Sequence, residues 1–250
     1  MPGPVEKYLL EKIKTDGSIH ITLIDPEKIT VQEASCVAEN SENSGTAAIM
    51  IGGSTFVSQA HLDDVVRAVK SAVKIPSILF PNNITGISGY ADAIWFMSLL
   101  NSVDPYFLIG AQILGAPLVK RYGIEPISMG YIIVGEGGTA GIVGKAISLP
   151  YSKPELAAAH ALAGQYLGMR FIYLEGGSGA SNPVPPEMIG TVKHLLNIPL
   201  IVGGGIRSKE QAIAAVSAGA DIIVTGNVTE SGGGKQRVSE IVTAIKSVKV

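Results

Sequence analysis

Eight short apolar runs alternate along this chain with segments of helical pattern, and this repetition restricts the folds that the chain can adopt. The runs are almost wholly apolar, as expected of strands that are buried on both faces. They lie at residues 19–24, 47–51, 77–80, 93–97, 127–134, 171–174, 200–202 and 221–224. Helical segments lie at residues 5–14, 31–40, 58–71, 105–122, 154–167, 186–196, 209–218 and 236–248. Eight β-then-α units predict a parallel α/β sheet closed into a (β/α)8 TIM barrel.

The unit after the third run departs from this repetition. Residues 81–92 hold a proline, two asparagines and two glycines, and they show no helical stripe. The prediction is a modified barrel in which an irregular connection replaces the helix between strands 3 and 4 and opens the barrel's side. The helix at residues 5–14 is expected to close the bottom. The length of 250 residues fits one barrel, and no linker is visible, so residues 1–250 are expected to form a single domain.

The composition is apolar and nearly neutral. Charged residues make up 16% of the chain, the formal net charge is −2 and the mean hydropathy is +0.34. This balance argues against nucleic acid as a partner and favours an apolar channel, a subunit interface or both. The single cysteine, Cys36, excludes an intrachain disulfide. Neither a signal peptide nor a membrane-spanning stretch is evident, so a cytoplasmic location is expected.

Three glycine-rich turns follow directly after the last three runs. Gly176, Gly177 and Gly179 follow the sixth, residues 203–205 the seventh, and Gly226 the eighth. Glycines at strand ends expose backbone N–H groups, and several such ends together bind a phosphate. The loops after strands 7 and 8 often form that site in (β/α)8 barrels. The alternative, plain tight turns, is weaker here. Arg207 is either a phosphate clamp or part of a surface ion pair.

Two acidic residues stand at expected strand ends, where barrel active sites form. Glu175 ends the sixth strand and is a candidate to accept a proton or bind a substrate hydroxyl. The alternative is an ion pair with Arg170 or Arg207. Asp25 ends the first strand, and Ser54 follows the second, so the two are expected to be neighbours. A carboxylate with a hydroxyl is a usual foothold for Mg²⁺, although both residues could simply cap turns.

Several other residues have mainly structural interpretations. His61, His160 and His194 fall in helical segments as expected surface residues, whereas His20 is expected in the core or at the barrel bottom. Trp95 is expected in core or interface packing or, if the barrel is open at its side there, in a groove for an apolar tail. Residues 133–141 are glycine-rich and long enough for a lid, with Glu136 and Lys145 as candidates to meet a diphosphate or a metal.

The combination of these motifs resembles the geranylgeranylglyceryl phosphate synthase family, the archaeal ether-lipid prenyltransferases. The resemblance covers essentially the whole chain. It is carried by Leu-Ile-Asp25-Pro-Glu-Lys, Gly-Gly-Ser54-Thr, Tyr173-Leu-Glu-Gly-Gly-Ser-Gly179, Val202-Gly-Gly-Gly-Ile-Arg and Thr225-Gly-Asn227. It implies that the 3-hydroxyl of sn-glycerol 1-phosphate attacks C1 of geranylgeranyl diphosphate, which forms an ether and releases diphosphate.

The resemblance also implies roles for individual residues. Asp25 and Ser54 would hold Mg²⁺, and Glu175 would engage the attacking hydroxyl as a base. The glycerol phosphate would contact Tyr173, Leu174, Glu175, Gly176, Gly177, Ser178, Gly179, Gly204, Gly205, Gly226 and Asn227. The twenty-carbon tail would lie in a groove starting at the gap of residues 81–92 and lined by the helix at 154–167 and the strand 4 region. A homo-oligomer, dimer or hexamer, is expected, with Tyr106 or Trp95 as a candidate interface aromatic.

Three alternatives stay open at this point. A related synthase that uses heptaprenyl diphosphate would differ in the depth of its groove. Another phosphate-binding barrel enzyme, an isomerase or aldolase, would need a lysine or paired aspartates at strand tips, and no strand tip here carries a lysine. A non-catalytic binder of phosphate ligands would bind glycerol phosphate without forming a product.

Overall fold

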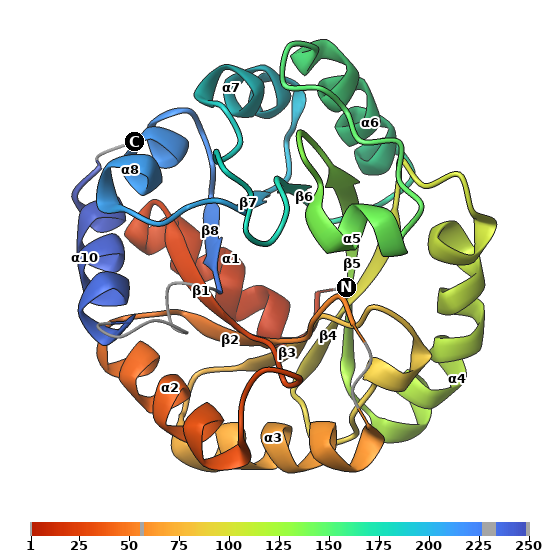
Figure 1. The fold of residues 1–250 in the computed structure, drawn as a ribbon, viewed down its shortest axis with the longest axis vertical. Coiled ribbons are helices and arrows are strands. Elements are labelled where there is room, and N and C mark those ends of the chain that lie inside the picture. The colour runs from red at the N-terminus through yellow and green to blue at the C-terminus, as the bar shows by residue number, and fades with distance from the viewer. Residues whose placement is uncertain (1, 56–57, 227–233, 249–250) are drawn as a thin grey trace.

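The computed structural model is a closed barrel of parallel strands that run in the order β1 to β8, surrounded by helices (Figure 1). It describes residues 2–55, 58–226 and 234–248. The strands are β1 (Ile19–Ile24), β2 (Ala48–Ile51), β3 (Ser77–Leu79), β4 (Ala93–Leu99), β5 (Glu125–Ile133), β6 (Phe171–Glu175), β7 (Leu200–Gly203) and β8 (Ile222–Thr225). The predicted TIM barrel is therefore confirmed.

The helices that surround the barrel follow the predicted segments closely. They are α1 (Pro4–Asp16), α2 (Val31–Asn43), α3 (Gln59–Ala72), α4 (Ala111–Tyr122), α6 (Pro154–Tyr166), α7 (Pro186–Leu195), α8 (Lys209–Ser217) and α10 (Gly234–Ser247). Side-chain caps start several of them: Thr30 and Glu33 form a capping box at α2, and Ser208 and Gln211 form one at α8. Helix α4 follows a π-helical turn, η2 (Tyr106–Gly110), within the segment expected to be one helix.

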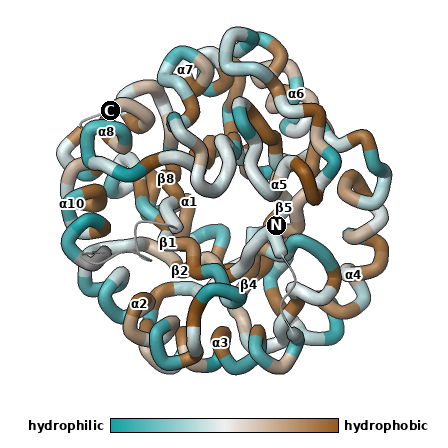
Figure 2. Tube along the Cα trace, in the orientation of Figure 1, coloured by the Kyte–Doolittle hydropathy of each residue, from teal (hydrophilic) through white to brown (hydrophobic). Residues whose placement is uncertain are grey.

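Side chains alternate between the inside of the barrel and the layer beneath the helices. On β1, Ile19 and Ile21 pack inside with Trp95 and Phe171, whereas Ile24 packs outward with Val65 of α3. The surrounding helices contain both hydrophobic and hydrophilic residues (Figure 2). Such helices can pack their hydrophobic residues against the sheet and expose the hydrophilic ones. In the parts of the chain that the structure describes, no helix is both long and apolar enough to cross a membrane.

Helix α1 closes the bottom of the barrel, as predicted. Leu9 is fully buried among the inward-facing strand residues. The Glu125 carboxylate, at the start of β5, accepts the backbone N–H groups of Val5 and Glu6 at 2.7 and 3.0 Å. Glu6 is itself buried, and burial raises its pKa, while an ion pair with Arg170 at 2.7 Å opposes that shift. These contacts fix the amino-terminal helix across the strand starts.

The connection between β3 and β4 is irregular, as predicted. Its only helical element among the described residues is a short 3-10 turn, η1 (Ile84–Gly86). The Asp92 carboxylate fastens the end of this connection to β3, because it accepts the backbone N–H and the hydroxyl of Ser77 at 2.9 and 2.8 Å. The pairing of β3 with β4 thus keeps the barrel closed, although the connection between these strands contains no full helix.

A buried histidine on the first strand joins the segment just before β2 to the last strand. His20 is 1% exposed and lies between the hydroxyls of Thr46 and Thr225, each 2.8 Å from one ring nitrogen. Thr46 also lies 3.2 Å from the Thr22 hydroxyl. Burial lowers the pKa of His20 from 6.5 to about 3, so the ring is neutral in the folded protein. The core position expected for His20 is confirmed.

The His20 environment predicts a loss of stability in acid. Its pKa is about 3 in the fold and near 6.5 when exposed, so the unfolded chain takes up the proton first as pH falls. The free energy of unfolding is therefore unaffected by protonation of this histidine above about pH 6.5. It decreases between about pH 6.5 and about pH 3, by a total on the order of several kcal/mol. His20→Gln should show a weaker pH dependence of the free energy of unfolding, measured by denaturant titration at pH 7 and pH 4.5. Equal losses in both proteins would contradict this assignment.

Candidate active site

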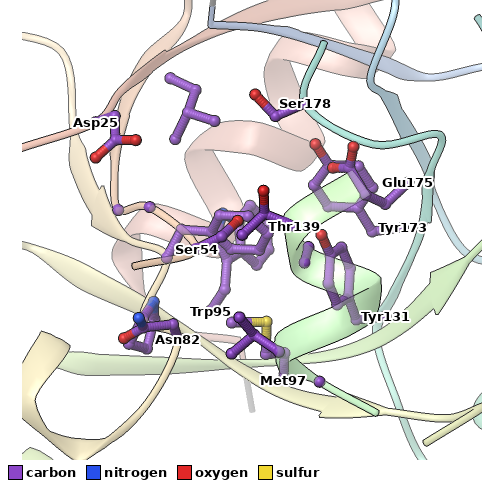
Figure 3. A pocket seen from close by; sticks show the side chains of 18 of the residues that line it. Asp25, Ser54, Asn82, Trp95, Met97, Tyr131, Thr139, Tyr173, Glu175 and Ser178 are labelled. Carbon is purple, nitrogen blue, oxygen red and sulfur yellow. The ribbon is translucent and has the colours of Figure 1, made fainter. Parts of the chain in front are cut away.

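A cavity of about 450 Å³ opens where the carboxyl ends of the strands meet (Figure 3). Its polar side is formed by residues that follow β1, β2, β6, β7 and β8. Its apolar side is formed by the β3–β4 connection, β4, α4 and the short helix α5 (Gly138–Val143). The predicted convergence of distant motifs at one end of the barrel is therefore present in the structure. Asp25 and Glu175 both face this cavity (Figure 3).

The glycine turns after β6 and β7 lie against each other, as an anion-binding site requires. Gly204 has a φ of +84°, and a Cβ there would lie 2.6 Å from both the Glu175 Oε1 atom and the Gly177 nitrogen. Gly205 has a φ of +74°, and a Cβ there would meet the backbone at Asn182. Only glycine permits this conformation and this approach of the backbone. At the rim of the cavity the backbone of these turns is therefore not covered by side chains of its own residues.

The structure separates the predicted phosphate-site residues into two groups. Those that line the cavity are Tyr173, Glu175, Ser178, Gly179, Gly204, Gly205 and Gly226. Those that lie behind it are Leu174, Gly176 and Gly177. Leu174 packs into the outer core, and the Gly176 nitrogen donates to the Gly203 carbonyl at 3.0 Å. Asn227 lies outside the described residues. The phosphate-site roles of these residues stay predictions.

Glu175 is buried at the boundary between the polar and apolar sides. Its Oε1 accepts the Gly177 N–H at 2.7 Å, and the hydroxyls of Tyr131 and Tyr173 donate to its carboxylate. Burial raises the pKa of Glu175, and these donors oppose that shift. The ion pair with Arg170 or Arg207 that was the alternative does not form, because Arg170 pairs with Glu6 and Arg207 donates to the Ala180 carbonyl at 2.7 Å.

Three aromatic rings lie beside this carboxylate. Phe80, Tyr131 and Tyr173 have ring centroids 5.2 to 5.6 Å from one another, with Phe80 stacked on Tyr173 and the other two pairs edge to face. Burial, followed by the Glu175 charge, raises the pKa values of both tyrosines well above 10, so both hydroxyls keep their protons. Tyr131 and Phe80 were not among the predicted site residues. Tyr131 stands opposite Tyr173 in the β5–β6 register, two positions after inward-facing Met129, and this spacing is the signal that could have identified it.

Asp25 and Ser54 also line the cavity, as predicted (Figure 3). The Asp25 carboxylate packs against Gly53, where a Cβ would lie 2.4 Å from its Oδ1 atom. Asp25 Oδ1 accepts the Glu27 N–H at 3.1 Å, and Oδ2 lies 3.1 Å from the Lys28 Nζ atom. Among the described residues no group of three or more His, Cys, Asp or Glu side chains gathers. The donor set still suits Mg²⁺, which takes one or two protein oxygens and completes its shell with water and phosphate.

His61, expected to be an ordinary surface residue, holds the loop that carries Asp25. Its Nε2 atom lies 2.8 Å from the Pro26 carbonyl and 3.2 Å from the Ile29 carbonyl. Both partners are acceptors, so Nε2 carries a proton. The His61 backbone N–H is bound by the Ser58 cap at 3.3 Å, which fixes the first turn of α3. Sequence spacing gave no signal for this contact, because the two segments are joined only by the fold.

The apolar side of the cavity passes through the gap left by the missing third helix. It contacts inward-facing Trp95 and Met97 of β4 as well as outward-facing Ile94 and Phe96. The predicted side groove is therefore present, but its walls differ from the prediction. Helices α4 and α5 line it, and no described residue of α6 does. Helix α6 instead packs on α7 and β5, farther around the barrel.

Three other predicted residues do not have the surroundings that one of their expected roles requires. Trp95 is 1% exposed inside the barrel, so it cannot serve as an interface aromatic. Lys145 and Glu136, candidates for a diphosphate or metal contact, are not part of the cavity lining. Lys145 pairs with Asp104 at 2.7 Å, and Glu136 accepts the Ser181 N–H at 3.4 Å. The glycine-rich segment, residues 133–141, includes the first residues of helix α5.

Fold and site together define an α/β-barrel protein whose mouth pairs a cluster of glycine turns with an apolar side groove. The chain belongs to the PcrB family, whose model matches residues 10–246.

Known relatives share nearly the full length of the chain. Geranylgeranylglyceryl phosphate synthase of Thermococcus kodakarensis is 57% identical over 95% of this chain and 94% of its own, and the enzyme of that name from Thermofilum pendens is 55% identical over 92% and 90%. The crystal structure of (S)-3-O-geranylgeranylglyceryl phosphate synthase from Thermoplasma acidophilum, in complex with substrate sn-glycerol-1-phosphate, is 41% identical. It has a TM-score of 0.95 and covers 99% of this chain and 100% of that one.

The His61 contact predicts that this side chain positions the Asp25 loop. His61→Phe removes the donor shared by two carbonyls, whereas His61→Gln keeps an N–H at the side-chain end. Such a bond is worth roughly 0.5–1.5 kcal/mol, so His61→Phe should lower kcat/KM for prenyl transfer about two- to tenfold. His61→Gln should recover most of this loss. A drop in melting temperature alone, with kcat/KM unchanged in both variants, would show that the contact only supports the fold.

Proposed function

We propose that this chain joins geranylgeranyl diphosphate to the 3-hydroxyl of sn-glycerol 1-phosphate, forming an ether and releasing diphosphate. The observation that carries the proposal is the position of Glu175. Its buried carboxylate lies between open glycine turns suited to a phosphate and a groove suited to a long apolar tail. Identities of 55–57% to enzymes named geranylgeranylglyceryl phosphate synthase support the same assignment.

In this proposal Glu175 removes the proton of the attacking hydroxyl. The hydroxyl oxygen forms a bond to C1 of the prenyl group, and the bond from C1 to the diphosphate oxygen breaks. A base for this step must be ionised yet basic, and the raised pKa of Glu175 improves its basicity. The Gly177 N–H and the two tyrosine hydroxyls keep the carboxylate oriented.

The aromatic cluster suits the electronic demand at C1. An allylic carbon gains positive charge as its bond to diphosphate lengthens, and aromatic faces attract positive charge. Phe80, Tyr131 and Tyr173 line the same cavity as Glu175. We infer that these rings both stabilise the charge and exclude water from C1.

We further propose Mg²⁺ dependence, with Asp25 and Ser54 as the protein ligands. When bound, the ion would neutralise negative charge on the departing diphosphate. Support comes from the chemistry of the donors and from Gly53, whose missing side chain leaves room for the Asp25 carboxylate. Asp25 is held by the Glu27 N–H and by the loop contacts of His61, so the carboxylate is oriented in advance.

The assembly and setting of the protein are proposals as well. Large hydrophobic side chains are exposed on α4 and α6, including Ile113, Leu114 and Tyr166 at 64, 55 and 78%. Such surfaces support a homo-oligomer, a dimer or hexamer, which light scattering would detect. The cytoplasmic location expected from the sequence stays a prediction.

Incubation with labelled sn-glycerol 1-phosphate, geranylgeranyl diphosphate and Mg²⁺ tests the proposed reaction. A product that extracts into organic solvent is expected, together with free diphosphate. Comparison with heptaprenyl diphosphate tests the chain length, and faster turnover of the C35 substrate would overturn the substrate assignment. Binding of glycerol phosphate with no product would favour the non-catalytic alternative.

Glu175→Gln should lower kcat about 10²- to 10⁴-fold while leaving the affinity for glycerol phosphate nearly intact. The amide is similar in shape but cannot accept the proton. Glu136→Gln is the matched control, because Glu136 lies outside the cavity lining, and it should retain full turnover. In the wild type, kcat should rise as pH increases through the raised pKa of Glu175. Unchanged turnover in Glu175→Gln would remove this residue from the mechanism.

Asp25→Asn should increase the Mg²⁺ concentration that gives half-maximal activity, roughly ten- to hundredfold, because a charged ligand becomes neutral. Direct binding of Mn²⁺, followed by electron paramagnetic resonance, should weaken in parallel. Asp104→Asn is the control, since Asp104 also pairs with a lysine but lies outside the cavity lining. Identical metal titrations for wild type and Asp25→Asn would refute the assigned role.

A further inference from the structure

We propose that Lys28 binds the diphosphate group of the prenyl substrate and stabilises it as it leaves. The inference rests on the proposed prenyl transfer and deepens it, because it assigns a protein cation to the leaving group. Lys28 is the last residue of the Leu-Ile-Asp-Pro-Glu-Lys motif. Lys28 lines the cavity, and its Nζ atom lies 3.1 Å from the Asp25 Oδ2 atom.

The loop after β1 fixes the backbone of Lys28 beside Asp25. The Lys28 N–H donates to the Asp25 carbonyl at 3.1 Å, and the Glu27 N–H donates to the Asp25 carboxylate at 3.1 Å. His61 binds the carbonyls of Pro26 and Ile29 on either side of this turn. These contacts fix the turn that carries both residues, and both residues line the cavity.

The lysine is the more exposed member of this pair. The Lys28 side chain is 48% exposed, whereas its partner Asp25 is 13% exposed. The four-carbon stem lets Nζ reach a neighbouring oxygen without movement of the backbone.

The charges that line the cavity single out Lys28. Of the described lining residues, the acidic ones are Asp25 and Glu175, and the basic ones are Lys28 and Arg207. Diphosphate carries several negative charges, more than one divalent cation neutralises. Arg207 follows the β7 glycine turn and donates to the Ala180 carbonyl, so it belongs to the glycerol phosphate side. Lys28 is next to the proposed metal carboxylate, where the leaving group must also lie.

The structure thus gives Asp25 and Lys28 complementary roles at one loop. Asp25 supplies negative charge for a cation, and Lys28 supplies positive charge for the anion held by that cation. As the C1–oxygen bond breaks, negative charge grows on the diphosphate oxygen, and Lys28 donates hydrogen bonds to it. No proton needs to be transferred, because diphosphate is a stable anion at neutral pH.

Three variants test the proposal. Lys28→Gln removes the charge, Lys28→Arg restores it, and Lys145→Gln is the matched control. Lys145 is also an exposed lysine paired with an aspartate, but it is outside the cavity lining. The measurements are KM for geranylgeranyl diphosphate, KM for glycerol phosphate, and the affinity for inorganic diphosphate by calorimetry, all at saturating Mg²⁺.

Loss of a charge-assisted hydrogen bond predicts a roughly ten- to hundredfold weaker affinity for inorganic diphosphate in Lys28→Gln. KM for the prenyl substrate should rise in parallel, while KM for glycerol phosphate stays unchanged. Lys28→Arg should recover most of the affinity, and Lys145→Gln should match the wild type.

Two results would overturn the assignment. If Lys28→Gln binds diphosphate as tightly as the wild type and shows only an altered Mg²⁺ titration, Lys28 acts through Asp25 alone. If KM for glycerol phosphate rises instead, Lys28 serves the other substrate. Failure of the proposed function is a separate outcome, since the wild-type protein would then form no prenylated product from either diphosphate.

Discussion

The parallel pairing of β8 with β1 is the contact on which the rest of the structure depends. Its register sets Thr22 opposite Thr225, so the loop that carries Asp25 and the turn at Gly226 leave the sheet side by side. In an open sheet the first and last motifs would lie at opposite edges. Closure also joins the strands through His20, which links Thr46 and Thr225 beneath the mouth. The candidate site therefore arises from ring closure, and no single motif could form it.

The irregular third unit gives the closed ring a way to hold a long ligand. A barrel interior filled by side chains has no room for an extended tail. Here Trp95, Phe171 and the other inward residues fill the lower barrel, so a tail must leave sideways. The β3–β4 connection leaves that space, and the cavity continues from inward-facing Met97 to outward-facing Phe96. The missing helix in one crossover thus gives the barrel the apolar side groove that the proposed function requires.

The elements were predictable from sequence because their signals are local. Apolar runs, helix caps and glycine turns each occupy a few neighbouring residues, and all eight strands were located. The contacts that shape the site are not local. His61 reaches back to Pro26, and Tyr131 meets Tyr173 only through the β5–β6 register. Trp95 could not be placed inside or outside by its apolar strand, because strands buried on both faces show no alternation. The expectation that helix α6 lines the groove came from the family resemblance alone, because no local sequence signal indicates which helices face the groove.

The environment of Glu175 shows how opposing forces set the properties of the site. Burial beside Phe80, Tyr131 and Tyr173 disfavours the charged carboxylate and raises its pKa, which strengthens it as a base. Too much burial would leave it protonated and inactive at neutral pH. The Gly177 N–H and the tyrosine hydroxyls offset part of that cost. Gly204 is necessary for the same reason, because a side chain there would occupy the space of the Glu175 Oε1 atom. The glycine turns that suit a phosphate thus also make room for the carboxylate that is proposed as the base.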